Sequence, residues 1–216
     1  MRGTVLEATR QYKITAILRG IGNDRITQVI DALYAGGIRL LEITFNQKLE
    51  TKLADTTMAI RYARETYGDT MHVGAGTVMS VEEIEAAKEA GAEFILAPNV
   101  NLEVIKKAVE LDIAAIPGAM TPTEVAAAYE AGAELVKLFP AGNLGPAYCK
   151  AVMAPINHVP MIAVGGVDDK NLGEFLAAGF VGAGIGSSLT DKKMIAEKNF
   201  QGLTRLAERY MKAAGL

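Results

Sequence analysis

The chain has 216 residues, half of them hydrophobic, and a formal net charge of −3. This length and hydrophobic content predict one compact domain over residues 1–216, and the absence of a basic block argues against nucleic-acid binding. A single cysteine, Cys149, excludes an intrachain disulfide, and two histidines are too few for a His- and Cys-rich metal site. The polar N-terminus and the lack of a long apolar stretch predict a cytoplasmic protein with no membrane partner.

Short apolar segments alternate with helical patterns along the chain. Eight of these segments have the composition of buried strands, at 14–18, 40–44, 72–75, 94–97, 114–117, 135–139, 161–164 and 182–185. Helical spacing fills the intervals, and an extra helix is expected over 5–12. Eight strand–helix repeats predict an α/β fold, a single-domain (β/α)8 TIM barrel with an extra N-terminal helix; an open α/β sheet would show the same alternation.

Helix ends are marked by local sequence signals. The patterns Ser80–Glu83 and Thr121–Glu124 are typical of capping boxes, in which the first side chain and the glutamate bond each other's backbone N–H groups. Glycine follows several helices, as after Ala90 and Ala131, where it suits a left-handed C-terminal cap. These signals predict where the helices begin and end between the strands.

Lys137 lies inside the apolar strand predicted at 135–139. Because an unpaired ammonium is costly to bury, a lysine in such a place tends to lose its proton and become a nucleophile. A structural lysine, paired with a carboxylate or extending its amine to the strand end, is the alternative.

Two further charged residues occur at the carboxyl ends of strands, where TIM barrels carry their active sites. Glu42 interrupts the second strand, and if its face points inward with that of Lys137 the two side chains can meet. Such a pair is either a structural ion pair or an amine beside a proton shuttle. Arg19 ends the first strand and is either a surface residue or a clamp for carboxylate or phosphate.

Glycine-rich loops follow the last two strands, at 164–167 and 184–188. Glycines allow backbone N–H groups to approach phosphate oxygens, and barrels often bind phosphate at these two loops. The spacing in 182–186 is not that of a dinucleotide-binding loop. Phosphate binding is therefore expected, although glycines also serve tight turns.

Together these segments resemble the class I 2-dehydro-3-deoxy-phosphogluconate/phosphogalactonate (KDPG/KDPGal) aldolases, which include the 4-hydroxy-2-oxoglutarate aldolases. The strand-six lysine combined with the strand-two glutamate is the specific part of the likeness. The resemblance covers nearly the whole chain in order, through residues 16–19, 41–45, 73–78, 97–98, 116–118, 135–140, 164–166 and 184–187.

The resemblance implies a role for each matching residue. Lys137 would form a Schiff base with the substrate's keto carbon, and Glu42 would be the general acid and base. The remaining matches are substrate-binding: Arg19 and Thr77 for the carboxylate, Pro98 and Phe139 as pocket walls, and Gly165, Gly166, Gly186 and Ser187 for the phosphate.

The implied reaction is cleavage of a 2-keto-3-deoxy-6-phosphoaldonate to pyruvate and glyceraldehyde 3-phosphate, a lyase step of carbohydrate metabolism. A second family substrate is 4-hydroxy-2-oxoglutarate, which gives pyruvate and glyoxylate. The family also implies a homotrimer that needs neither metal nor cofactor. The competing interpretations are another phosphate-binding barrel enzyme, such as an epimerase or sugar-phosphate synthase, a metal-dependent aldolase, and a non-catalytic phosphate-binding barrel.

One position departs from a common family pattern. Asn46 stands where many members have an arginine that helps to bind the carboxylate, which places more weight on Arg19. The configuration at C4 of the substrate and the need for its phosphate depend on placement around Thr44, Asn46, Pro98 and Ser187, so the sequence leaves both open.

Overall fold

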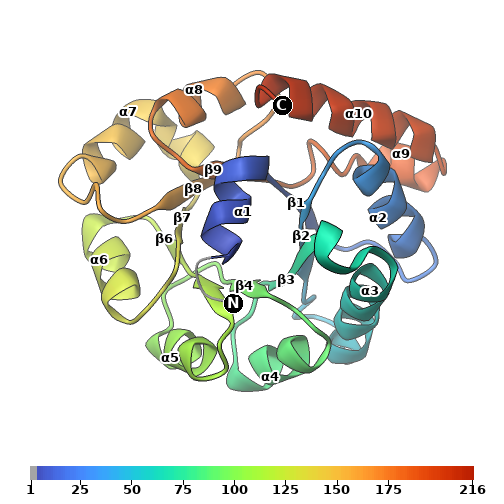
Figure 1. Cartoon of the computed structure of the whole chain (residues 1–216), viewed down its shortest axis with the longest axis horizontal. Helices are drawn as coiled ribbons and strands as arrows, with labels where there is room; N and C mark the ends of the chain where they lie inside the picture. The colour runs from blue at the N-terminus through green and yellow to red at the C-terminus, as the bar shows by residue number, and fades with distance from the viewer. Residues whose placement is uncertain (1–3) are drawn as a thin grey trace.

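The computed structural model describes residues 4–216; residues 1–3, which the predicted domain also includes, lie outside the described residues. The strands of this range are β1 (Ile14–Leu18), β2 (Leu40–Thr44), β3 (His72–Gly76), β4 (Phe94–Leu96), β5 (Ala114–Ile116), β6 (Gly118–Ala119), β7 (Val136–Leu138), β8 (Met161–Val164) and β9 (Gly182–Ile185). They form one parallel sheet in the order β5-β4-β3-β2-β1-β9-β8-β7-β6, which curves into a barrel (Figure 1).

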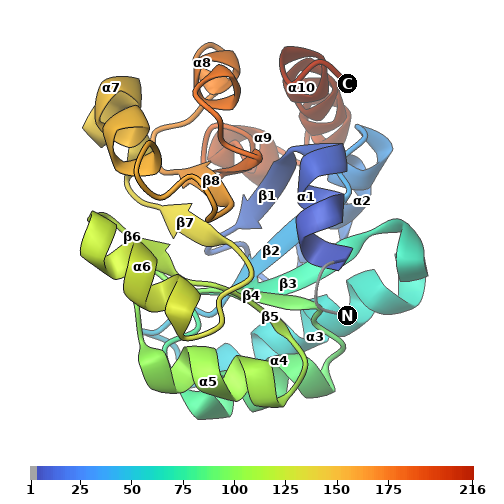
Figure 2. The ribbon, with the colours of Figure 1, turned by 60° about the vertical axis from the view of Figure 1, so that its left-hand side comes forward.

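Helices surround the barrel, and the first of them along the chain lies across one of its ends, as Figures 1 and 2 show. They are α1 (Thr4–Tyr12), α2 (Ile26–Ala35), α3 (Lys52–Tyr67) with the 3-10 turn η1 (Gly68–Thr70), α4 (Val81–Glu89), α5 (Leu102–Glu110), α6 (Pro122–Glu130), α7 (Ala141–Met153), α8 (Leu172–Ala177), α9 (Lys192–Ala196) and α10 (Phe200–Ala213). None of the helices in the described range is long and apolar enough to cross a bilayer.

The predicted TIM barrel and its extra N-terminal helix are confirmed, with one difference in the fifth strand. The strand predicted at 114–117 ends at Ile116 as β5, and a separate short strand, β6, begins at Gly118, because Pro117 lies between them and has no N–H for the ladder. Ile116 O accepts from Ala97 N at 3.3 Å on one side, and Pro117 O accepts from Lys137 N at 2.9 Å on the other. The two end strands of the sheet, β5 and β6, are therefore joined through Pro117 alone, and this closes the barrel.

Strand side chains alternate between the barrel interior and the surrounding helices. Leu41 and Val136 belong to the apolar layer beneath the helices. The interior cluster contains Ile17, Leu40, Phe94, Leu96, Ala114, Ile116, Leu135, Ile162 and Val164. Val5 and Ala8 of α1 join the interior cluster, so α1 covers the end of the barrel where the strands begin (Figure 1).

One of the two predicted capping boxes is complete. At α6, Thr121 Oγ1 accepts from Glu124 N while the Glu124 carboxylate accepts from Thr121 N, as predicted. At α4, Ser80 Oγ accepts from Glu83 N, but the Glu83 carboxylate accepts from Met79 N and from two side chains. Glu83 therefore departs from the predicted box, and its side chain serves another part of the structure.

Candidate active site

Glu42 and Lys137 both lie on inward faces of the barrel strands. Glu42 shares the face of Leu40 on β2, and Lys137 shares that of Leu135 at β7, and both leucines belong to the interior cluster. Glu42 is 0% exposed and Lys137 is 4% exposed. The alternation of strand side chains thus brings the predicted pair into one region, as expected.

The Glu42 carboxyl group is buried without a partner. Burial raises its pKa, and the positive charges of Lys137 and Arg19 oppose the rise without cancelling it. Neither carboxyl oxygen has a hydrogen-bond partner among residues 4–216, so Glu42 accepts no hydrogen bond from Lys137. Since buried polar atoms are nearly always satisfied in folded proteins, these oxygens are available to a bound molecule.

Burial lowers the pKa of Lys137, the nearby Glu42 carboxylate opposes the shift, and the Arg19 guanidinium adds to it. The neutral, nucleophilic amine is therefore more populated than in a free lysine. Lys137 Nζ lies 5.0 Å from the centre of the Phe139 ring, which forms one wall beside the amine. The structural ion pair considered for Lys137 is absent at hydrogen-bond distance within the described residues.

Gly76 makes room for the Glu42 carboxyl group. A Cβ atom at this position would overlap Glu42 Oε1, so any larger residue forces the carboxyl group to move. The preceding inward glycine, Gly74, similarly leaves space for the Phe94 ring. Small residues on β3 thus set the position of the β2 carboxyl group.

Gly76→Ala is expected to lower kcat by about 10² because a 1 Å misplacement of a reacting group can cost that much. The adduct with pyruvate that the family resemblance implies at Lys137 should persist, since the β7 strand is untouched. The matched control is Gly173→Ala on α8, where an added Cβ meets nothing within 4 Å. A kcat equal to that of the control would show that the carboxyl position is not critical.

Arg19 and Thr77 form a polar edge beside this pair. Arg19 Nη2 donates to Thr77 Oγ1 at 3.2 Å. Both residues also line a recess of about 250 Å³ with Thr44 and Asn46, which lie at the end of β2. The guanidinium group and hydroxyl group at this edge are suitable ligands for a carboxylate.

A cavity of about 430 Å³ opens at the carboxyl ends of the strands. Nine of the predicted site residues line it: Arg19, Thr77, Pro98, Lys137, Phe139, Gly165, Gly166, Gly186 and Ser187. Of the other two, Glu42 is fully buried, and Thr44 lies in neighbouring pockets.

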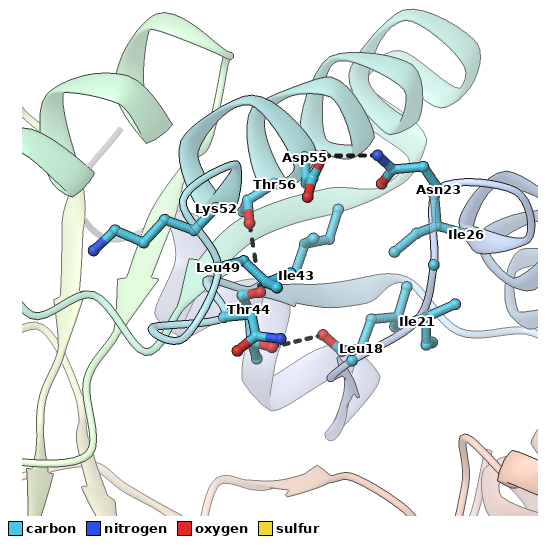
Figure 3. A pocket seen from close by; sticks show the side chains of 13 residues that line it. Leu18, Ile21, Asn23, Ile26, Ile43, Thr44, Leu49, Lys52, Asp55 and Thr56 are labelled. Carbon is cyan, nitrogen blue, oxygen red and sulfur yellow. Dashed lines mark hydrogen bonds between the residues drawn. The ribbon is translucent and has the colours of Figure 1, made fainter.

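Thr44 is oriented by strand contacts. Its hydroxyl donates to Leu18 O at 3.0 Å, and its carbonyl accepts from Thr56 Oγ1 at 3.4 Å. Figure 3 shows these contacts in a separate pocket of about 200 Å³ between the ends of β1 and β2 and the start of α3. The structure therefore brings Thr44 close to Arg19 and Thr77 in the recess, but not into the main cavity.

The cavity also has lining residues that were not among the predicted site residues, although all but Asp168 lie in segments that the sequence analysis singled out: Ile17, Val164, Val167, Asp168, Gly184 and Ser188. Ile17 and Val164 are the last inward residues of their strands, so strict alternation is the signal that identifies them. Asp168 Oδ1 accepts from Lys170 N and Asn171 N, so this carboxylate stabilises the turn before α8.

Comparison with known proteins gives a consistent group of relatives. A family model described as KDPG and KHG aldolase matches residues 5–206. The 2-dehydro-3-deoxy-6-phosphogalactonate aldolase of Escherichia coli K12 is 35% identical over 201 residues, covering 93% of this chain and 95% of the relative. A 2-dehydro-3-deoxy-phosphogluconate aldolase of Treponema pallidum is 31% identical over 214 residues, 99% of each chain.

Solved structures agree with the sequence relatives. One described as native KDPGal is 35% identical with a TM-score of 0.81, covering 94% of this chain and 96% of the other. The KDPG aldolase of Legionella pneumophila, solved with pyruvate captured as a covalent carbinolamine, is 25% identical with a TM-score of 0.84, covering 96% and 97%. A designed protein cage built by fusing symmetric oligomeric domains is 33% identical with a TM-score of 0.83, covering 95% of this chain and 73% of that chain.

Proposed function

The chain belongs to the KDPG and KHG aldolase family, and on that premise we propose that it cleaves a 2-keto-3-deoxy-6-phosphoaldonate to pyruvate and glyceraldehyde 3-phosphate through a Schiff base on Lys137. One observation carries the assignment: a buried lysine with a lowered pKa faces the same interior as a buried glutamate that has a raised pKa and no hydrogen-bond partner among residues 4–216. Groups whose environments perturb their pKa values in this way are typical of acid–base and nucleophilic sites.

Carbon–carbon cleavage requires an acceptor for the bonding electron pair and a base for the hydroxyl proton. Neutral Lys137 attacks the C2 carbonyl, and loss of water leaves an iminium ion that accepts the electrons. The Glu42 carboxylate removes the C4 hydroxyl proton as the C3–C4 bond breaks, which releases the aldehyde and leaves an enamine. Protonation at C3 and hydrolysis of the iminium then release pyruvate and regenerate Lys137. The raised pKa of Glu42 makes its carboxylate a stronger base than that of a free glutamate, which suits it to take and return a proton.

The rest of the cavity matches the two charged ends of such a substrate. Arg19 and Thr77 supply a guanidinium group and a hydroxyl group for the carboxylate next to the keto carbon. The loops after β8 and β9 also line the cavity: Gly165 and Gly166 adopt positive φ angles of 86° and 73°, and Gly186 and Ser187 lie in the same lining. We assign the phosphate to these loops because such backbone turns present N–H groups to anions.

The test is borohydride reduction in the presence of pyruvate, followed by peptide mass mapping. A stable adduct on Lys137 is expected, and its absence would refute the proposed chemistry. A panel of keto acids epimeric at C4, each with and without phosphate, then identifies the substrate. Equal turnover of the unphosphorylated acids would contradict the phosphate assignment.

The rate of adduct formation with pyruvate should rise with pH as Lys137 loses its proton, with a midpoint below the ordinary 10.5 because burial lowers the pKa of this lysine. Arg19→Leu should move the midpoint to higher pH, since the positive guanidinium group helps to lower that pKa. Trapping rates measured across a pH series check the direction. A midpoint shifted to lower pH would contradict the assigned electrostatics.

We further propose a trimer, supported by exposed apolar side chains that follow three of the strands. Met79, Leu102 and Met120 are 38%, 46% and 45% exposed, and they follow β3, β4 and β6 at the same end of the barrel. Sedimentation velocity should give the mass of three 22.9 kDa chains. Met120→Glu should shift the population toward smaller species because a buried charge disfavours association. A monomeric wild-type protein would refute this proposal.

A cytoplasmic location follows from the proposed substrate. A keto acid that carries both a carboxylate and a phosphate is multiply charged and does not cross a lipid bilayer unaided. The enzyme that consumes it is therefore expected in the compartment where the substrate is made, and cell fractionation checks this expectation.

A further inference from the structure

Glu83, at the start of α4, is a fully buried carboxylate outside the cavity. Its side chain is 1% exposed. Its Oε1 accepts from Lys52 Nζ at 2.6 Å and from Gln47 Nε2 at 2.7 Å, and its Oε2 accepts from Met79 N at 2.6 Å. The capping Glu124 on α6 makes the equivalent backbone contact with Met120 N, but within the described residues its only side-chain partner is the nearby Thr121. The contacts of Glu83 with Lys52 and Gln47 therefore go beyond helix capping.

These contacts keep Glu83 ionised. Burial alone would raise its pKa, but the hydrogen bonds from Lys52, Met79 N and Gln47, together with the Lys52 charge, outweigh burial and lower the pKa. Every partner is a hydrogen-bond donor, so the site has no place for a proton on either oxygen. In a Glu83→Gln variant the NH2 group, a donor, would face another donor: either Met79 N–H or the side chains of Lys52 and Gln47.

The ionised Glu83 fixes the orientation of Gln47. Gln47 Nε2 donates to Glu83 Oε1 and also to Thr77 O at 2.9 Å, and Gln47 Oε1 accepts from Lys52 Nζ at 2.8 Å. The reversed amide would place its oxygen against two acceptors and its NH2 group against an ammonium. Lys52 reaches these groups because its amine points away from the pocket drawn in Figure 3.

Gln47 in turn holds a strained residue at the edge of the active site. Thr77 has a φ angle of 56°, in the left-handed region that β-branched residues rarely adopt. Such conformations are unfavourable and persist where neighbouring contacts impose them. The Thr77 carbonyl is held by Gln47 and its hydroxyl by Arg19, and both Thr77 and Arg19 line the cavity that contains Lys137.

We propose that Glu83, acting through Lys52 and Gln47, is a positioning residue that holds Thr77 and Arg19 in the geometry needed to bind the substrate carboxylate. The inference rests on the proposed function and adds the means by which the carboxylate subsite is built. The network joins the loop after β2 to the loop after β3, which the backbone bond from Phe45 N to Gly76 O also links, at 2.8 Å. With Asn46 in the place of an arginine, the subsite depends on Arg19 and Thr77 and therefore on this network.

The experiment measures how much pyruvate half-saturates borohydride trapping at Lys137. Glu83→Gln and Gln47→Leu should each raise the half-saturating concentration by about 10-fold, since a lost hydrogen bond to a charged group is worth about that factor. The maximal amount of adduct should stay the same because Lys137 and Glu42 are untouched. The double variant should need no more pyruvate for half-saturation than the more affected single variant, since both substitutions disrupt the same hydrogen-bond network.

Two controls separate positioning from general destabilisation. Glu124→Gln removes the equivalent capping glutamate from α6, a helix of 9 residues like α4, without touching Thr77. Glu93→Gln disrupts another largely buried carboxylate, which pairs with Arg64 and His72. Both should change half-saturation less than about twofold, as expected for sites that share no partners with the subsite.

The outcomes distinguish the two proposals. If the wild-type protein forms no adduct, the Schiff-base function fails, and the carboxylate role fails with it. If the wild-type protein forms the adduct and Gln47→Leu, whose side chain is exposed, leaves half-saturation unchanged, the positioning role alone is overturned. Equal weakening by Glu124→Gln would also overturn it, because the effect would then come from loss of a helix cap.

Discussion

Lys137→Met is expected to reduce turnover by about five orders of magnitude, since removing the amine removes the electron acceptor on which the rate enhancement depends. Methionine has a similar length and no charge, so it should fill the space beside Phe139 without a cavity. The protein should fold at least as well as the wild type, because burial disfavours the charged form of Lys137. A coupled assay for pyruvate release measures the loss, and borohydride trapping should give no adduct.

The control for this variant is Lys107→Met. Lys107 forms ion pairs with Glu85 and Glu110 on the outer helices, far from the cavity residues, so its loss should leave turnover unchanged. Turnover of Lys137→Met within about tenfold of the wild type would mean that the chemistry does not pass through this amine, because nucleophile loss costs far more than that.

The second large effect is expected from Glu42→Gln. The amide keeps the size of the side chain but cannot remove a proton, so kcat should fall by about 10² to 10⁴, the usual worth of a general base. Burial of the Schiff-base pocket is unchanged, and pyruvate should still form an adduct with Lys137. The variant thus separates imine formation from carbon–carbon cleavage.

The pH response of Glu42→Gln provides an independent check. The Glu42 carboxylate raises the pKa of Lys137, so its removal should lower that pKa further. The pH midpoint of adduct formation should then move to lower pH, opposite to the shift expected for Arg19→Leu. Undiminished cleavage, or a midpoint moved to higher pH, would show that Glu42 is not the base beside Lys137.

Much of the barrel and its central pair could be predicted from local patterns. Apolar runs located the strands, and the period of two placed Glu42 and Lys137 on inward faces. The break at Pro117 was missed because the proline counts as one more apolar residue of the strand at 114–117, although it has no N–H to donate to a neighbouring strand. Proline followed by glycine is the signal that marks it.

The polar network around Thr77 could not be predicted in the same way. Ser80–Glu83 fits a capping box, and only the fold shows that the carboxylate instead meets Gln47 and Lys52, which are 36 and 31 residues earlier in the chain. Spacing within one helix contains no information about contacts between two loops. Thr44 was predicted to bind substrate but lies outside the main cavity, where its hydroxyl donates a hydrogen bond to a carbonyl of the neighbouring strand. This contact between two strands could not be predicted from local patterns either.

The short helix α1, packed on the interior cluster, has a consequence for the order of events during turnover. It covers the barrel end opposite the cavity, so in the described part of the chain a substrate enters and both products leave at the carboxyl ends of the strands. In the proposed mechanism the pyruvyl fragment is still covalently attached to Lys137 when glyceraldehyde 3-phosphate forms, so the aldehyde departs first. Pyruvate, which leaves last, should therefore be a competitive inhibitor against the keto acid, and glyceraldehyde 3-phosphate should be a noncompetitive one. In the condensation direction pyruvate should bind before the aldehyde.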